Sequence, residues 1–180
     1  MNYCSNCGAK LNYRIPDGDD LLRYICDTCH VIHYINPKIV VGCIPEWENK
    51  ILLCRRAIEP RKGKWTLPAG YLENDETLAE GARRETFEET KAHVEIIAPY
   101  AIFNLTFINQ IYLMFRGQLI DNTFGPSSES THVELFSEKD IPWDDLAFNV
   151  MQETLVRFFK DHSKGVFPFQ MGDIAPHLFK

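Results

Sequence analysis

The stretch GYLENDETLAEGARRETFEETKA, residues Gly70–Ala92, decides the fold. Seven of its 23 residues are acidic, and Glu85, Glu88 and Glu89 fall within what reads as one helix. Carboxylates three and four residues apart on a helix repel each other by a few tenths of a kcal/mol per pair. The three side chains project within an arc of about 100° on one side of that helix. This crowding indicates that a cation neutralises the group.

The start of this helix is marked by the sequence. Thr77-x-x-Glu80 is a capping-box pattern, which predicts Thr77 as the N-cap. An apolar stripe is expected from Leu78, Ala79, Ala82 and Phe87. Taken alone, the segment also allows a solvated acidic face whose partners are Arg83 and Arg84.

Composition bounds the rest of the chain. With 180 residues, 45% hydrophobic and 24% charged, the protein has the size of one domain with a small appendage. A net charge of -6 disfavours a surface that coats nucleic acid. The N-terminus has no basic segment followed by an apolar one, and no apolar run reaches the roughly 20 residues of a membrane span. We therefore expect a cytoplasmic protein whose cysteines are reduced or bound to metal.

Four cysteines form two C-x-x-C pairs, Cys4–Cys7 and Cys26–Cys29, separated by 18 residues. Four thiolates at this spacing predict a closed tetrahedral site for structural Zn²⁺ in a zinc ribbon. Cys26-x-x-Cys29-His30 also fits c-type haem attachment, but that interpretation leaves the first pair unexplained and is rejected. The remaining Cys43 and Cys54 are predicted to be small core residues.

The ribbon is predicted to span residues 1–35, a main domain 36–163, and an irregular tail 164–180. Asn36-Pro37 marks the first boundary as a turn. The main domain mixes α and β structure, because β-rich runs and two helical patterns alternate along it. The strands are expected at residues 38–45, 50–56, 93–98, 100–105, 110–119 and 132–136, and the second helix near Met151 to Phe159.

A basic segment precedes the acidic one. Five cations between Arg55 and Lys64 face a single acid, Glu59, giving a local charge of +4. Such a segment is either a solvated loop or a basic lip for a polyanionic substrate.

The acidic segment resembles the diagnostic box of the Nudix hydrolases, G-x5-E-x7-R-E-U-x-E-E-x-G-U. The six polar or glycine positions that match are Gly70, Glu76, Arg84, Glu85, Glu88 and Glu89. Three positions depart from the box: Thr86 replaces an apolar residue, Lys91 the terminal glycine, and Ala92 a bulkier aliphatic residue. A left-handed Lys91 costs roughly 1 kcal/mol relative to glycine, which affects stability alone. The resemblance implies an α+β fold, an α/β/α sandwich around a mixed sheet, here with an N-terminal zinc ribbon.

The resemblance also implies roles for side chains. Glu85 and Glu89 are expected to bind Mg²⁺ or Mn²⁺, with Glu88 as a further ligand or a water-positioning group, and the backbone carbonyl of Ala69 to complete the metal shell. Arg84 is expected to orient the carboxylates. The group that takes the proton from water stays open between Glu85, Glu88 and Glu129, and Glu129 is equally well interpreted as an exposed loop carboxylate.

The subgroup that the chain resembles includes FAD and ADP-ribose pyrophosphatases. NADH diphosphatases with a zinc ribbon carry an S-Q-P-W-P-F-P-x-S string after the box, and no such string follows Ala92 here. FAD is therefore the expected substrate, with ADP-ribose as the nearest competitor and NADH as the alternative. The residues expected to contact it are Arg55, Arg56, Trp65 and Phe103, with Phe107 as a further candidate for ring stacking.

Two other classes of function stay open on the sequence: a Nudix-like binding module without turnover, and a zinc-ribbon adaptor for nucleic acid. The complete acidic set argues against the first, and the net acidity against the second. The expected partner is a small-molecule dinucleotide or nucleotide-sugar, with no nucleic acid and no membrane, and a homodimer is an assembly to test.

Overall fold

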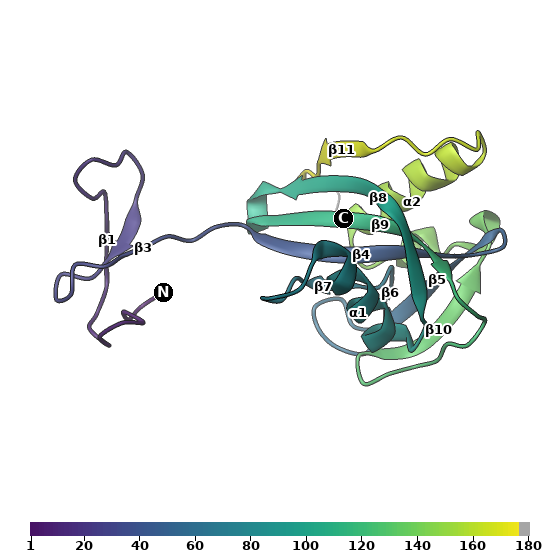
Figure 1. Cartoon of the computed structure of the whole chain (residues 1–180), viewed down its shortest axis with the longest axis horizontal. Helices are drawn as coiled ribbons and strands as arrows, with labels where there is room; N and C mark the ends of the chain where they lie inside the picture. Colours follow the sequence, from purple (N-terminus) through teal and green to yellow (C-terminus); the bar gives the residue numbers. More distant parts are fainter. Residues whose placement is uncertain (177–180) are drawn as a thin grey trace. The chain divides into compact units, whose positions relative to one another are not determined.

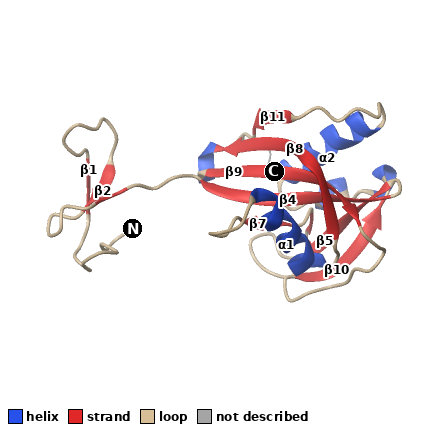
Figure 2. Ribbon diagram, in the orientation of Figure 1, coloured by secondary structure: helices blue, strands red, loops and turns tan. Residues whose placement is uncertain are grey.

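The computed structural model describes residues 1–176, and these form two compact units, Met1–Asn36 and Pro37 onward (Figures 1 and 2). The first unit is a three-stranded antiparallel sheet of β1 (Asn12–Arg14), β2 (Arg23–Ile25) and β3 (Ile32–His33). Its hydrophobic cluster is small, with Cys4, Leu11 and Cys26 as the buried residues, and Ile25 of β2 is also buried. A core this small needs a further cross-link such as a metal site.

The second unit is built on a large mixed sheet. Its main strands are β4 (Lys38–Trp47), β5 (Lys50–Arg56), β8 (Val94–Leu105), β9 (Gln110–Leu119), β10 (Ser130–Phe136) and β11 (Gln170–Asp173). They run in the order β10-β5-β4-β9-β8-β11, with the β4–β9 and β8–β11 pairs parallel and the others antiparallel. Two short strands branch from this path: β6 (Trp65–Thr66) pairs with β5, and β7 (Ala69–Tyr71) with β4.

Two α-helices cover the sheet, α1 (Leu78–Thr90) and α2 (Asn149–His162). Successive side chains of a strand point to opposite faces, and β4 shows which helix lies on which face. Val40 and Ile44 share a core with Leu155 of α2, whereas Val41 packs with Ala82 of α1. The helices therefore lie on opposite faces, as Figure 1 shows for α1 and α2. The predicted mixed sheet between helices is confirmed.

Short 3₁₀ turns complete the unit, at Thr106–Ile108, Glu138–Asp140 and Trp143–Asp145. Two predictions about elements need correction. The strands expected at 93–98 and 100–105 form one strand, β8, with register irregularities between Ile96 and Ala98 and between Pro99 and Ala101. Proline has no N–H for the ladder, so it is tolerated at such an irregularity. The segment after Lys164 was expected to be irregular, yet it contains β11, which pairs with β8.

The helix α1 begins as the sequence predicts. Thr77 is the N-cap, and its side chain and that of Glu80 form a reciprocal capping box. Lys91 at the C-cap is left-handed, with φ 58°, and its N–H donates to Phe87 O at 2.8 Å. The predicted apolar stripe is wrong for Leu78 and Phe87, which are 39% and 40% exposed. The buried face of α1 consists instead of Gly81, Ala82, Glu85, Thr86, Glu89 and Thr90.

Candidate active site

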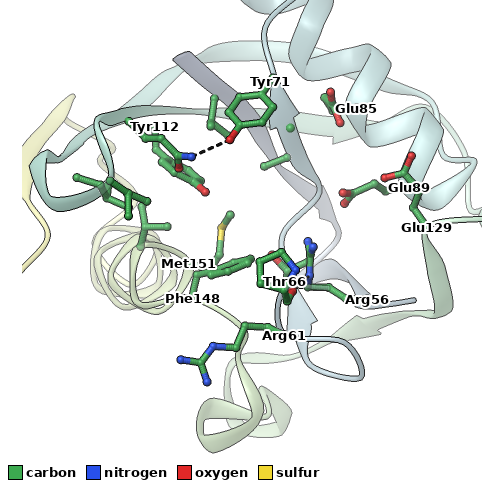
Figure 3. Close-up of a pocket in the computed structure, with 18 of the residues that line it drawn as sticks. Arg56, Arg61, Thr66, Tyr71, Glu85, Glu89, Tyr112, Glu129, Phe148 and Met151 are labelled. Atoms are coloured by element: carbon green, nitrogen blue, oxygen red, sulfur yellow. Dashed lines mark hydrogen bonds between the residues drawn. The ribbon is translucent and has the colours of Figure 1, made fainter. Parts of the chain in front are cut away.

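A pocket of about 760 Å³ opens in the second unit, between β7, the buried face of α1 and the start of α2 (Figure 3). One wall is acidic and carries Glu85, Glu88, Glu89 and Glu129. Ala69 and Gly70 of β7 line the pocket beside it. The structure thus brings all four predicted catalytic carboxylates and the predicted carbonyl position to one cavity.

Glu85 and Glu89 are nearly buried on α1, with 9% and 6% of their surface exposed. Hydrogen bonds to backbone carbonyls fix the elements that carry the acidic wall. The Ser130 hydroxyl donates to the backbone carbonyl of Glu89, which ties the C-terminal part of α1 to the start of β10. The backbone carbonyl of Glu129 accepts from Ala57 N at 2.7 Å, so the loop that carries Glu129 is fixed next to the end of β5.

Arg84 organises the acidic residues around it. Its Nε and Nη2 donate to the two oxygens of Glu76 at 2.9 and 2.7 Å, and Nη2 also reaches Tyr71 O at 3.0 Å. Its Nη1 donates to Glu85 Oε1 at 2.7 Å and to Glu88 Oε2 at 3.0 Å. These hydrogen bonds lower the pKa of Glu76 to about 2, because they favour its ionised form. The predicted orienting role of Arg84 is consistent with this geometry.

Gly70 leaves the room that the Glu85 carboxylate occupies. A Cβ at position 70 would lie 2.2 Å from Glu85 Oε2 and 2.4 Å from its Cδ. A Cβ on Gly81 of α1 would also be crowded, since it would lie 2.8 Å from Glu76 Oε1 and 2.9 Å from Val41 Cγ2. The glycine of the sequence motif is therefore required by close approach, and its φ is not in the left-handed region.

Burial raises the pKa of both inner carboxyls. Desolvation raises the pKa of Glu85, and it raises the pKa of Glu89 to about 7, with the charges of Glu85 and Glu129 adding to the effect. Cys54 Sγ donates to Glu89 Oε2 at 3.2 Å, and burial raises the pKa of this thiol well above its usual value. Sequence reasoning identified Cys54 as a buried core residue, which it is, but missed its contact with Glu89. No local signal predicts that contact, because it joins β5 to α1 across 35 positions.

The acidic wall has the donor chemistry of a Mg²⁺ or Mn²⁺ site. Crowded carboxylates that are poorly hydrated favour a hard cation, and Mg²⁺ in proteins uses one or two carboxylates and keeps several waters. Within residues 1–176, the four cysteines of the first unit are the one group of His, Cys, Asp or Glu side chains whose ligand atoms already lie close enough together to hold a metal ion. Glu85 and Glu88 are drawn towards Arg84 instead. We therefore regard Glu85, Glu88 and Glu89 as a wall that fits such an ion rather than a closed cage.

The opposite side of the pocket is apolar and aromatic. Tyr112, Phe148 and Met151 lie across the cavity from Glu85 and Glu89 in Figure 3, whereas Tyr71 lies beside Glu85. Phe107, on the turn after β8, also lines the pocket, as the sequence allowed. Tyr112, Phe148 and Met151 were not predicted, because each carries only an apolar signal that fits a core residue equally well.

Of the four residues predicted to contact the substrate, one lines the pocket. Arg56 lines the pocket, and its Nε donates to Pro60 O at 2.8 Å. The other three do not line it. Arg55 donates to Gly63 O at 2.7 Å, Trp65 packs edge-on against Phe136 at 4.9 Å, and Phe103 is 0% exposed in the core.

Only part of the basic segment faces the pocket. Arg56 and Arg61 line the cavity. Lys64, by contrast, pairs with Asp145 at 2.6 Å. The local charge of +4 is therefore not directed as a whole at the acidic wall.

The first unit holds the predicted cysteine cluster. The sulfurs of Cys4 and Cys29 are 3.6 Å apart and those of Cys7 and Cys26 are 3.4 Å apart, with all four within 4.8 Å of one another. Tetrahedral Zn²⁺ with Zn–S bonds near 2.3 Å places its sulfurs about 3.8 Å apart. The four thiols fit structural zinc, and His33 Nε2 lies 3.3 Å from Cys4 Sγ at the edge of the cluster.

Comparison with known families agrees with both units. Residues 2–35 match the family model described as Nudix N-terminal, a zinc ribbon, and residues 36–158 match the NUDIX domain. The chain belongs to the Nudix family. No helix in the described part of this Nudix protein is long and apolar enough to cross a membrane.

Similar proteins include a solved Nudix hydrolase from Nitrosomonas europaea, 55% identical, with a TM-score of 0.94 over 97% of this chain and 99% of that one. An ADP-ribose pyrophosphatase from Methanocaldococcus jannaschii is 46% identical over 83 residues, which are 46% of this chain and 45% of that protein. The NAD-capped RNA hydrolase NudC from Vibrio parahaemolyticus is 29% identical over 145 residues, 79% of this chain and 53% of that protein. The chain thus spans about half the length of these two curated relatives.

Proposed function

We propose that this Nudix protein hydrolyses the diphosphate linkage of a nucleoside diphosphate joined to a second group. The observation that carries the proposal is one pocket with a buried carboxylate wall on one side and an aromatic wall on the other. Such a pocket has room for both halves of a nucleotide: the charged linkage at the glutamates and a flat ring at the apolar side. Membership of the Nudix family and the similarity to a Nudix hydrolase support it.

The side chains of the acidic wall have distinct parts in this proposal. Glu85 and Glu89, with Glu88, would hold Mg²⁺ or Mn²⁺, which when bound supplies charge neutralisation at the nonbridging oxygens of the diphosphate. Arg84 fixes Glu85 and Glu88 by hydrogen bonds of 2.7 and 3.0 Å. Arg56, on the lining of the same pocket, contributes a positive charge for the phosphates.

The reaction transfers a phosphoryl group to water. The oxygen of water forms a bond to one phosphorus as the bond from that phosphorus to the bridging oxygen breaks, and a carboxylate accepts the proton. Glu85, Glu88 and Glu129 are the candidates for this carboxylate, since all three line the pocket.

We propose FAD as the preferred substrate, cleaved to AMP and FMN, with ADP-ribose, cleaved to AMP and ribose 5-phosphate, as the nearest competitor. The relative named ADP-ribose pyrophosphatase supports a substrate with an ADP half. The missing S-Q-P-W-P-F-P-x-S string after Ala92 supports FAD over NADH. NADH stays as the second candidate, because a relative carries the name NAD-capped RNA hydrolase.

The test is a comparison of kcat/KM for FAD, ADP-ribose and NADH with Mg²⁺ or Mn²⁺, with the products identified by chromatography. We expect AMP from each substrate that is cleaved, the highest kcat/KM for FAD, and no turnover after chelation. A tenfold advantage for NADH, about 1.4 kcal/mol in transition-state binding, would overturn the choice of FAD. Lack of turnover with all three, in protein that binds the cation, would overturn the proposed reaction.

A further inference from the structure

Cys54 is a buried thiol that packing alone does not explain. The residue is 1% exposed, yet none of the apolar clusters formed by the described residues includes it. Cys43, the other buried thiol of the second unit, packs in such a cluster with Leu52, Val94 and Leu119. A free cysteine in a protein interior usually acts as a small apolar side chain. That role accounts for Cys43 and leaves the sulfur of Cys54 to be explained.

The thiol of Cys54 contacts the carboxylate of Glu89. Its Sγ lies 3.2 Å from Glu89 Oε2 and 3.7 Å from the backbone carbonyl oxygen of Thr66. A thiol has a single hydrogen to donate, so these two acceptors compete for it. The carboxylate is the stronger acceptor, because hydrogen bonds to an ionised group are about twice as strong as those between neutral groups. The shorter distance and the charge both assign the S–H to Glu89.

Both partners of this contact are carried by a fixed backbone. Cys54 lies in β5 between two strands, opposite Val133 of β10 and Thr66 of β6. The Ser130 hydroxyl holds the backbone carbonyl of Glu89. A cysteine has one side-chain torsion that places its sulfur, whereas a glutamate needs several torsions fixed before its carboxylate keeps one orientation. The sulfur is therefore the rigid partner, and the carboxylate is the group that the contact orients.

We propose that Cys54 is a positioning residue for the acidic wall: its S–H donates to Glu89 Oε2 and keeps that carboxylate in the orientation that binds the divalent cation. The inference rests on the proposed function, since it assigns a partner to one carboxylate of the same site. Groups that hydrogen-bond to metal-binding side chains orient them, and their loss typically costs about 10–100-fold in metal affinity. Because a thiol is a weak donor, we expect the loss for Cys54 at the lower end, about tenfold.

The experiment measures the binding of Mn²⁺ by calorimetry to the full chain, with zinc bound to the cysteine cluster and no nucleotide present, so it needs no turnover. Cys54→Ala removes the donor and Cys54→Ser keeps one, at nearly equal volume. Cys43→Ala is the matched control, because it removes a thiol from a position that is 0% exposed and lies in an apolar cluster. Glu89→Gln identifies the binding event that belongs to the acidic wall, and urea unfolding reports the stability of each variant.

We expect Cys54→Ala to raise the Kd for Mn²⁺ about tenfold, while Cys54→Ser stays within about threefold of wild type and Cys43→Ala leaves the Kd unchanged. A packing role alone predicts the reverse order, because a buried site tolerates an apolar alanine better than a serine hydroxyl. An unchanged Kd in Cys54→Ala, a serine variant as weak as the alanine variant, or an equal loss in Cys43→Ala would each overturn the proposal.

An infrared measurement keeps the proposal testable if the Cys54 variants do not fold. Thiols that bind zinc are deprotonated, so in zinc-loaded Cys43→Ala protein Cys54 is the one of the six cysteines that still carries an S–H. A hydrogen bond to a carboxylate lowers the S–H stretching frequency, and the neutral amide of Glu89→Gln is a weaker acceptor. The band should therefore move to higher frequency when Glu89→Gln is added. A band at the same frequency in both proteins would overturn the contact.

The outcomes separate this inference from the proposed function. Weakened Mn²⁺ binding by Cys54→Ala, in a protein that cleaves none of the substrates, would refute the proposed function and leave the role of Cys54 standing. A protein that cleaves diphosphates, and whose Cys54→Ala variant binds Mn²⁺ as wild type does, would refute the role of Cys54 and leave the proposed function standing.

Discussion

Replacing Gly70 by alanine should disable the site through a single methyl group. The new Cβ would lie 2.2 Å from Glu85 Oε2 and 2.4 Å from its Cδ, so the carboxylate must move by roughly 1 Å to reach an ordinary contact distance. That movement acts on the 2.7 Å hydrogen bond from Arg84. A displacement of about 1 Å in a positioned catalytic group costs on the order of 10²-fold in rate. We therefore expect kcat/KM to fall about 10²-fold.

The assay is the hydrolysis of the best substrate at saturating Mg²⁺, with urea unfolding to follow stability. Overpacking of this kind destabilises a fold by about 1–3 kcal/mol. Glu85→Ala removes the carboxylate that the new Cβ would contact. In that background, Gly70→Ala should therefore lower the free energy of unfolding much less than it does in the wild type. Gly125→Ala is the matched control, because a Cβ there meets nothing within 4 Å. Activity of Gly70→Ala within threefold of wild type would refute the argument that Glu85 must stay where it lies.

Three further outcomes test other parts of the molecule. Glu89→Gln should lower kcat by at least about 10²-fold without loss of fold, because it removes one charge from the acidic wall, and near-normal rates at saturating Mg²⁺ would contradict its role. Cys4→Ser should release about one zinc per chain and loosen the unit before Asn36, as metal analysis and proteolysis would show; four freely reactive thiols in the gently purified wild type would argue against the site. In metal-free protein, the raised pKa of Glu89, about 7, means that the folded state holds a proton which the unfolded chain releases near pH 4.5. Stability from this group is thus complete below that pH and declines by up to about 3 kcal/mol as the pH rises to about 7, so urea melts in chelator should show a fall from about pH 4.5 to about pH 7 that Glu89→Gln lacks.

The parts of the site that the sequence predicts are those encoded by local spacing. Glu85, Glu88 and Glu89 share one helix, so their clustering follows from helical geometry once Thr77 marks the start. The two C-x-x-C pairs are likewise local signals, because each pair places two thiols within reach of one ion. The residues on the substrate side of the pocket depend instead on how distant strands pair. Arg55 and Arg56 are neighbours in one strand and therefore point to opposite faces, and only the pairing of β5 decides that Arg56 lines the pocket.

Apart from Phe107, the aromatic side of the pocket could not be predicted from the sequence, for the same physical cause. Phe103 and Phe107 are four residues apart, yet one is fully buried in the core and the other lines the cavity. Tyr112 and Asn149 come from β9 and α2, and no pattern in either segment distinguishes a pocket residue from a core residue. The stripe predicted for α1 failed because this helix buries Glu85 and Glu89 while Phe87 is exposed.

The hydrogen bonds of Arg84 decide how the site treats an incoming anion. A guanidinium has five N–H donors, and those of Arg84 are all engaged by Glu76, Glu85, Glu88 and Tyr71 O. Arg84 therefore has no donor left for a phosphate oxygen, although it is the cation nearest the carboxylates in sequence. At the acidic wall itself, a bare dinucleotide meets charges of its own sign and is repelled, and the cations on the pocket lining, Arg56 and Arg61, belong to the basic segment instead. We expect association to speed up as the divalent cation concentration rises and to slow when the nucleotide exceeds the cation, an order-of-binding signature that stopped-flow measurements would show.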